Sequence, residues 1–304
     1  MFKHLLVPLD GSRMAEVSLA TAVFLARTLG AGITLFHVIE RGAPQDIHGE
    51  RHLTGPDEAR DYLGEVAGRT LPADISVERH VHTNEVNDVA RSIAEHVGEL
   101  GPDLIVMCTH GRGGLRGFMF GRIAQQVVGL GTTPVLLVPP VAAGASPAFS
   151  YNRILVALDG NPDHEEGLKV AASLAKICGA ELCLIMAVHT SDTLSGEEAT
   201  PAKLLPGATR ALLDLAAQDA EKYLDGHVTA LRAAGFTVSS EVRHSDPPTV
   251  IVATAERTKS DLIVLGTHGK TGMDAFWSGS ATPNVTSRSV LPLLLVPVQG
   301  KEPG

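Results

Sequence analysis

The chain has 304 residues, of which 44% are hydrophobic and 19% are charged, and its formal net charge is −9. This composition is typical of a globular chain long enough for two ordinary domains, and it excludes an intrinsically disordered protein. The acidic balance argues against sequence-independent binding to nucleic acid or to an anionic membrane. The first residues lack the apolar length of a signal peptide, and three cysteines are too few for a disulfide framework. We therefore expect a cytoplasmic protein without a membrane span.

The first half of the chain alternates apolar runs with helical patterns. In chain order we expect strand 4–9, helix 13–29, strand 33–39, helix 57–70, strand 76–81, helix 86–99, strand 103–108, helix 121–130 and strand 134–138. Strands that alternate with helices form parallel units with right-handed crossovers. The nearly continuous apolar run from Asp103 to Met107 indicates a sheet that helices cover on both faces.

The second half repeats this order. HLLVPLDGS at 4–12 recurs as RILVALDGN at 153–161, and PDLIVMCTHGRGG at 102–114 recurs as SDLIVLGTHGKTG at 260–272. The expected elements of this half are strands near 153–158, 182–188, 237–242, 261–266 and 292–297, with a long helix at 208–234. A repeat of this length indicates a duplicated domain rather than a short-period solenoid.

This pattern predicts two tandem α/β domains, each built on a doubly wound, five-stranded parallel sheet. We place them at residues 1–140 and 151–299, because the stretch 139–152 between them is rich in Pro, Ala, Gly and Ser, as a linker should be. In such sheets, ligands bind beyond the carboxyl ends of the strands, where the strand order reverses.

Three features of the second half converge on those strand ends. Asp159 follows the first strand, the stretch Gly266–Gly269 follows the fourth strand, and Gly279 and Ser280 precede the last helix. Glycines allow the backbone to approach a ligand closely, and a helix N-terminus with a hydroxyl group is a ready phosphate site. Asp159 and its counterpart Asp10 have a second interpretation, as capping residues of the helix that follows.

Gly269, Lys270 and Thr271 also match the last three letters of a phosphate-binding P-loop. That motif needs a further glycine at position 264, where Val264 lies inside an expected strand. A strand does not also wrap a phosphate, so we interpret these glycines as part of a different phosphate site.

The spacing of Gly266, Gly269, Gly279 and Ser280 resembles the nucleotide-binding motif of universal stress proteins, in which nine residues separate the second glycine from Gly-Ser. The resemblance covers both halves and implies a tandem universal stress protein. The implied fold is Rossmann-like, of the adenine nucleotide alpha hydrolase-like type. The ATP-binding members of this family hold adenine and ribose with the strand-one Asp and the end of strand two. Their phosphates lie on the glycine loop and the last helix.

Carried over residue by residue, the resemblance implies an ATP site in each half, with Mg²⁺ as a candidate companion ion. In the second half the implied contacts are Ala157, Leu158, Asp159, Ala187, Leu265, Gly266, His268, Gly269, Gly279, Ser280 and Ala281. In the first half they are Pro8, Leu9, Asp10, Val38, Met107, His110, Gly111, Gly121, Arg122 and Ile123. There, Cys108 stands where the motif has its first glycine and Arg122 where it has Ser or Thr. We expect an intact site in the second half and a variant site, with binding left open, in the first.

The leading interpretation is an ATP-binding regulatory protein of the stress response. Two alternatives stay open: a slow ATPase of the same fold, and a nucleotide-free dimerisation scaffold or metal-binding stress protein. His110 and His268 either contact the ligand or shape the turn between glycines. No catalytic constellation is evident, so we expect at most slow ATP hydrolysis.

The other histidines and cysteines carry weaker signals. His80 and His82 lie on one face of an expected strand, and His244 lies in the equivalent region of the second half. Two ligands fall short of the three or four that zinc needs, so we expect no metal site. Cys108 ends an apolar strand, which favours a buried, inert thiol over a redox-sensitive one.

The closing strands at 134–138 and 292–297 are very apolar and are expected at a sheet edge, where an unpaired strand invites pairing. The family resemblance implies that these last strands pair the two halves within the chain. We also expect association into a homodimer. Adenine nucleotide is the small-molecule partner, and neither nucleic acid nor a membrane is expected to bind.

Overall fold

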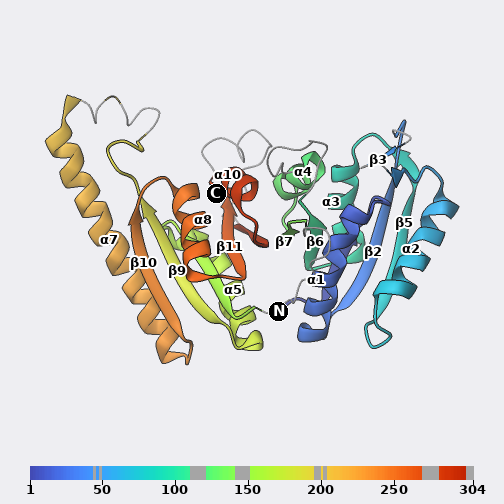
Figure 1. The fold of residues 1–304 in the computed structure, drawn as a ribbon, viewed down its shortest axis with the longest axis horizontal. Coiled ribbons are helices and arrows are strands. Elements are labelled where there is room, and N and C mark those ends of the chain that lie inside the picture. Colours follow the sequence, from blue (N-terminus) through green and yellow to red (C-terminus); the bar gives the residue numbers. More distant parts are fainter. Residues whose placement is uncertain are drawn as a thin grey trace, which may run out of the picture.

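The computed structural model describes residues 1–43, 46–47, 50–109, 121–140, 151–194, 200, 204–268 and 281–298. Figure 1 shows two α/β halves side by side, the first in blue to green and the second in yellow-green to red. No helix in these described ranges is long and apolar enough to cross a membrane.

The first half follows the predicted alternation of strands and helices. Its elements are β1 (His4–Pro8), α1 (Arg13–Leu29), β2 (Gly32–Glu40), a small hairpin of β3 (Asp46–Ile47) and β4 (Glu50–Arg51), α2 (Pro56–Thr70), β5 (Val77–Val86), α3 (Val89–Leu100), β6 (Leu104–Cys108), α4 (Arg122–Leu130) and β7 (Val135–Val138).

The second half has the same plan, with a longer helix at its outer edge. Its elements are β8 (Arg153–Leu158), the 3₁₀ helix η1 (Pro162–His164), α5 (Glu166–Cys178), β9 (Glu181–Val188), α7 (Pro206–Ala233), β10 (Val238–His244), α8 (Pro247–Thr258), β11 (Leu262–His268), α10 (Thr282–Arg288) and β12 (Leu293–Val298).

Each half is a five-stranded parallel sheet, which confirms the predicted fold class. The strand order is β5-β2-β1-β6-β7 in the first half and β10-β9-β8-β11-β12 in the second. The order therefore reverses between β1 and β6, and between β8 and β11. β7 and β12 lie antiparallel, with Leu137 opposite Leu293 and Val135 opposite Leu295. This pairing joins the halves into a single ten-stranded sheet.

Local capping explains where several helices begin. Ser12 caps α1, because its Oγ accepts a hydrogen bond from the Ala15 N–H at 3.2 Å. Asp88 caps α3 in the same way, through the Arg91 N–H at 3.0 Å. This cap explains one error in the sequence-based boundaries: β5 continues to Val86, and the helix predicted from 86 begins only after Asp88.

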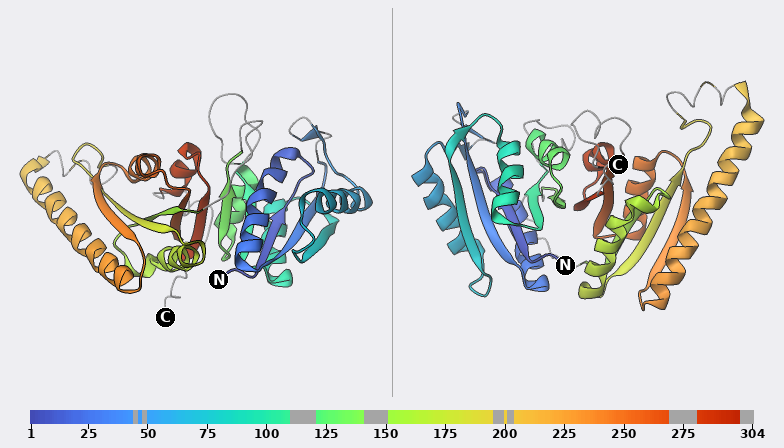
Figure 2. Two further views of the ribbon diagram at one scale, coloured as in Figure 1. Left: turned by 60° about the horizontal axis from the view of Figure 1, so that its bottom comes forward. Right: turned by 180° about the vertical axis from the view of Figure 1, so that it is seen from behind.

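The sheet separates two hydrophobic cores. Side chains of the strands alternate between them, since Leu5 and Val7 belong to one core and Leu6 to the other. Helices α1, α2, α5 and α7 cover the first face, and α3, α4, α8 and α10 cover the second (Figure 2).

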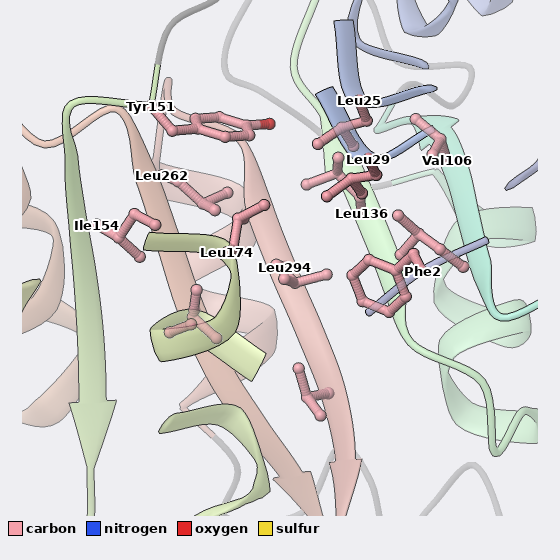
Figure 3. Close-up of a cluster of buried hydrophobic side chains, with 14 of the residues drawn as sticks. Phe2, Leu25, Leu29, Val106, Leu136, Tyr151, Ile154, Leu174, Leu262 and Leu294 are labelled. Carbon is pink, nitrogen blue, oxygen red and sulfur yellow. The ribbon is translucent and has the colours of Figure 1, made fainter. Parts of the chain in front are cut away.

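The core on the first face continues across the boundary between the halves. Figure 3 shows Leu25, Leu29 and Leu136 of the first half facing Tyr151 and Leu294 of the second. The rings of Phe24 and Tyr151 make an edge-to-face contact with centroids 5.4 Å apart. The two halves therefore share hydrophobic side chains as well as strand hydrogen bonds.

Candidate nucleotide site

The predicted site residues gather at the carboxyl edge of each five-stranded sheet. Asp10 follows β1 and Asp159 follows β8, which are the central strands of the two halves. In both turns the next residue is a glycine with positive φ, 92° at Gly11 and 80° at Gly160. This conformation strains any residue with a Cβ, so the turn after the first strand requires a glycine in both halves.

In the first half, Asp10 holds Ser12, the N-cap residue of α1. Its Oδ1 accepts hydrogen bonds from the Ser12 N–H at 2.9 Å and from the Ser12 hydroxyl at 2.7 Å. The Ser12 Oγ in turn accepts from the Ala15 N–H. The interpretation of Asp10 as the capping residue is therefore wrong in detail: Ser12 is the N-cap, and Asp10 orients it. A ligand would have to share this carboxylate with Ser12.

In the second half, Asp159 has a partner that the sequence did not reveal. Its Oδ1 accepts from the Asn161 N–H at 3.0 Å, and His164 Nδ1 donates to its Oδ2 at 2.6 Å. The Asn161 Oδ1 accepts from the Asp163 N–H, so its amide nitrogen faces His164 Nε2, 3.1 Å away. In this network Nδ1 of His164 donates to the Asp159 carboxylate, and Nε2 lies next to the donor nitrogen of the Asn161 amide. The signal in the sequence was a histidine five residues after the strand-one Asp.

Gly266 is required by a contact inside the protein. A Cβ at this position in β11 would lie 2.9 Å from the carbonyl oxygen of His164 in η1, which is too close for a real side chain. The first half has no such 3₁₀ helix in its described residues, because α1 begins directly at Arg13. Cys108 can therefore stand at the equivalent position. This cysteine is half-buried, not fully buried as we had expected.

The apolar site residues lie at the same edge. Ala157 and Leu158 end β8, and Leu265 of the neighbouring strand β11 pairs with Ala157. Ala187 lies near the end of β9. Pro8, Leu9, Val38 and Met107 occupy the matching places at the ends of β1, β2 and β6. The structure thus brings together the predicted base-binding and ribose-binding positions of each half.

The phosphate-binding positions are only partly described. Gly121 is the N-cap of α4 with φ −63° and ψ 141°, and its N–H donates to the Thr109 carbonyl at 2.7 Å. Arg122 is exposed at the first position of this helix, followed by Ile123. Ala281 precedes α10 in the second half. His110, Gly111, Gly269, Gly279 and Ser280 lie outside the described residues, and His268 is described only as the last backbone position of β11.

A buried histidine next to the first site was missed from the sequence. His37 of β2 is 2% exposed, and its Nδ1 donates to the Leu9 carbonyl at 2.7 Å. Burial lowers the pKa of His37 below its ordinary value, although the bond to Leu9 opposes this shift. His37 is therefore neutral at pH 7 and holds the ends of β1 and β2 together. The sequence did contain a sign of it, because His37 is a polar residue inside an otherwise apolar strand.

The histidines on β5 gain a third neighbour from α3. His82 Nδ1 lies 3.2 Å from His96 Nε2, and the ring centroids of His80 and His96 are 5.2 Å apart. His96 Nδ1 donates to the Ser92 carbonyl at 2.7 Å. Over the described ranges, no group of three or more His, Cys, Asp or Glu side chains is arranged to hold a metal ion. His244 ends β10 at the far side of the other half.

Comparison with known proteins identifies the family of both halves. The Universal stress protein family matches residues 1–139 and 150–297. A universal stress protein of Methanocaldococcus jannaschii is 30% identical over 152 residues, which cover 50% of this chain and 85% of that protein. A universal stress protein of Mycobacterium tuberculosis is 27% identical over 202 residues, 64% of this chain and 61% of the other.

A solved structure covers almost the whole chain. The crystal structure of a universal stress protein from Archaeoglobus fulgidus aligns with a TM-score of 0.70 at 19% identity, over 98% of this chain and 97% of that one. At this identity the likeness shows the tandem fold alone. With the two family matches, the duplicated sheets lead to one conclusion: the chain is a tandem-domain member of the universal stress protein family.

Proposed function

We propose that this chain is an ATP-binding regulatory protein of the stress response, with a nucleotide site at the carboxyl edge of each half. The observation that carries the proposal is the position of Asp159, which follows β8 where the strand order reverses beside β11. Ligands of doubly wound sheets bind at this point. Membership of the universal stress protein family and the spacing of Gly266, Gly269, Gly279 and Ser280 support adenine nucleotide as the ligand.

The second half has the intact motif in this proposal. The side chain of Asp159 is 49% exposed, so a ligand can reach it although the turn already engages both of its oxygens. A carboxylate offers about four lone-pair positions, which leaves acceptor capacity for a ribose hydroxyl or an adenine amino group. The phosphates would lie on Gly269, Gly279 and Ser280.

The first half has the variant site. Gly121 and the exposed Arg122 stand at the start of α4. The N-terminus of a helix favours an anion, and a guanidinium can bind a phosphate through two hydrogen bonds. Cys108 replaces a glycine that the second half needs for its own 3₁₀ helix, so its presence does not by itself argue against binding.

Equilibrium titration with ATP tests the proposal in two matched variants, Gly279→Asp and Gly121→Asp. The backbone of Gly121 has extended dihedral angles that Asp adopts readily, and Asp is a good helix N-cap, so this variant should fold. A carboxylate at either position repels the phosphates of its own half. We expect Gly279→Asp to abolish the stronger binding phase; normal ATP binding by this variant would refute the site assignment.

The number of sites is read from the nucleotide bound to the purified protein. About two ATP per chain would establish that both halves bind, and about one, lost in Gly279→Asp only, would restrict binding to the second half. No nucleotide and no binding on titration would refute the proposal. Repeating the titration with EDTA shows whether Mg²⁺ accompanies the phosphates, which its preference for phosphate oxygens favours.

We further propose that the halves associate in solution through β7 and β12, and that the chain forms a homodimer. Two observations support the first part: Leu137 pairs with Leu293, and apolar side chains of both halves pack together at the boundary between them (Figure 3). Since this pairing leaves neither β7 nor β12 as a free edge, a homodimer would use another surface. Light scattering tests the second part, and a mass near 31.9 kDa at all concentrations would exclude the homodimer.

A further inference from the structure

Each half contains a partly buried hydrogen bond between a glutamate near the start of its first helix and a tyrosine of its next long helix. In the first half, the carboxylate of Glu16 in the first turn of α1 accepts from the Tyr62 hydroxyl of α2 at 3.1 Å. The guanidinium of Arg69, also on α2, pairs with the same oxygen at 2.5 Å. The Glu16 side chain is only 11% exposed. A mostly buried carboxylate that accepts from two donors on one neighbouring helix links the two helices strongly.

The second half has the same bond between a glutamate and a tyrosine, with a histidine in place of the arginine. The carboxylate of Glu165, at the start of α5, accepts from the Tyr223 hydroxyl of α7 at 2.7 Å. His227 Nε2 lies 3.1 Å from the same oxygen. Glu165 lies six residues after Asp159, as Glu16 lies six residues after Asp10. Between these positions the two turns have only the glycine in common. The Asp, the Glu and the bond from the tyrosine to the Glu are nevertheless present in both halves.

In the second half, the link connects α7 to the residues that follow the turn after β8. Glu165 adjoins His164, whose imidazole donates to Asp159 and whose carbonyl oxygen lies against Gly266. A movement of Glu165 would therefore shift both the strand-one carboxylate and the end of β11. Burial and Glu165 raise the pKa of Tyr223, and Asp159 adds to this shift, as Asp10 does for Tyr62 in the first half. In both halves, the charge of the strand-one Asp therefore adds to the rise in the pKa of the tyrosine.

We propose that Glu16 with Tyr62, and Glu165 with Tyr223, are positioning pairs that hold the strand-one Asp turn of each half in the geometry that nucleotide binding requires. This inference rests on the proposed function. α7 packs on β9 and β10, and α2 packs on β2 and β5, so each tyrosine is anchored to the sheet on its own side. Each pair then acts on its own half and leaves the other half unchanged.

Three variants in the second half test the pair, with one matched control. Glu165→Ala removes the acceptor, Tyr223→Phe removes the donor, and Glu165→Gln keeps an oxygen that can accept from Tyr223. The control is Glu166→Ala, because Glu166 is the next residue, its side chain is 45% exposed, and it pairs with Lys169 on its own helix. Each variant is titrated with ATP in a Gly121→Asp background, so that only the second half is read.

We expect ATP to bind about tenfold more weakly to Glu165→Ala and to Tyr223→Phe, because the apparent affinity falls with the fraction of molecules whose turn keeps the binding geometry. Glu165→Gln should recover most of the affinity and Glu166→Ala should match the parent. Amide hydrogen exchange gives an independent reading: the Asn161 N–H, which donates to Asp159, should exchange faster in Glu165→Ala and Tyr223→Phe only.

The outcomes separate this inference from the proposed function. Parent protein that binds ATP, with all four variants binding equally, would overturn the positioning role and leave the function intact. Parent protein that binds no ATP would refute the proposed function, and exchange at Asn161 would then decide: unchanged exchange in Glu165→Ala also overturns the positioning role. A loss of affinity in Glu166→Ala as large as in Glu165→Ala would likewise overturn it.

Discussion

Replacing Tyr151 with phenylalanine should stabilise the protein. Tyr151 is 3% exposed, and its hydroxyl has no hydrogen-bond partner among the described residues. Figure 3 shows this hydroxyl directed from the second half toward the apolar side chains of the first. A buried hydroxyl without a partner costs about 1–3 kcal/mol, and Phe keeps the ring that packs edge-to-face on Phe24. We expect the free energy of unfolding to rise by about 1 kcal/mol and the Tm by about 2–4 °C.

Urea unfolding followed by circular dichroism measures this change, with Tyr62→Phe as the matched control. The Tyr62 hydroxyl donates to Glu16, so its loss leaves a buried acceptor short of a partner and should destabilise the protein. A Tyr151→Phe variant that unfolds at lower urea than the parent would refute the reasoning, because it would show that the hydroxyl is satisfied. Equal shifts of both variants would show that phenol removal has a general effect unrelated to hydrogen bonding.

Two further predictions concern the backbone and the histidines. Gly266→Ala should lower the free energy of unfolding by about 1–3 kcal/mol, because its Cβ would meet the His164 carbonyl. The control, Gly68→Ala, has open space around the new Cβ and should be neutral or stabilising. Equal effects of the two variants in urea unfolding would contradict this prediction. Stability should also fall as the pH drops below about 6.5, because burial lowers the pKa of His37 and of His80 in the folded chain, so the unfolded chain takes up protons first. For His37 the free energy of unfolding falls by up to about 1.4 kcal/mol per pH unit. His37→Asn should reduce the dependence of stability on pH, measured by urea unfolding at pH 7.5 and 5.5. The same pH dependence in His37→Asn and in the parent would show that other groups cause it.

The alternation of apolar runs and helical patterns was sufficient to predict the two tandem five-stranded sheets. The signal is strong because a strand buried on both faces must be apolar along its whole length, as from Leu104 to Met107. Because the chain repeats, each strand or helix pattern was seen once in each half, which strengthened the prediction. Boundaries were less certain: β5 runs past the predicted end at 81 to Val86, because pairing with β2 continues there and Asp88 sets the start of α3.

The sequence by itself also placed Asp10 and Asp159 at the ends of the central strands, because the position of a turn depends on local residues. Only the tertiary structure decided which side chains meet them. His164 reaches Asp159 because a 3₁₀ turn, not an α-helical one, follows that carboxylate, and the same turn brings a carbonyl oxygen against Gly266. Tyr223 reaches Glu165 across a separation of 58 residues. Such contacts depend on how helices pack on the sheet, and the pattern of apolar and polar residues along the chain does not encode that packing.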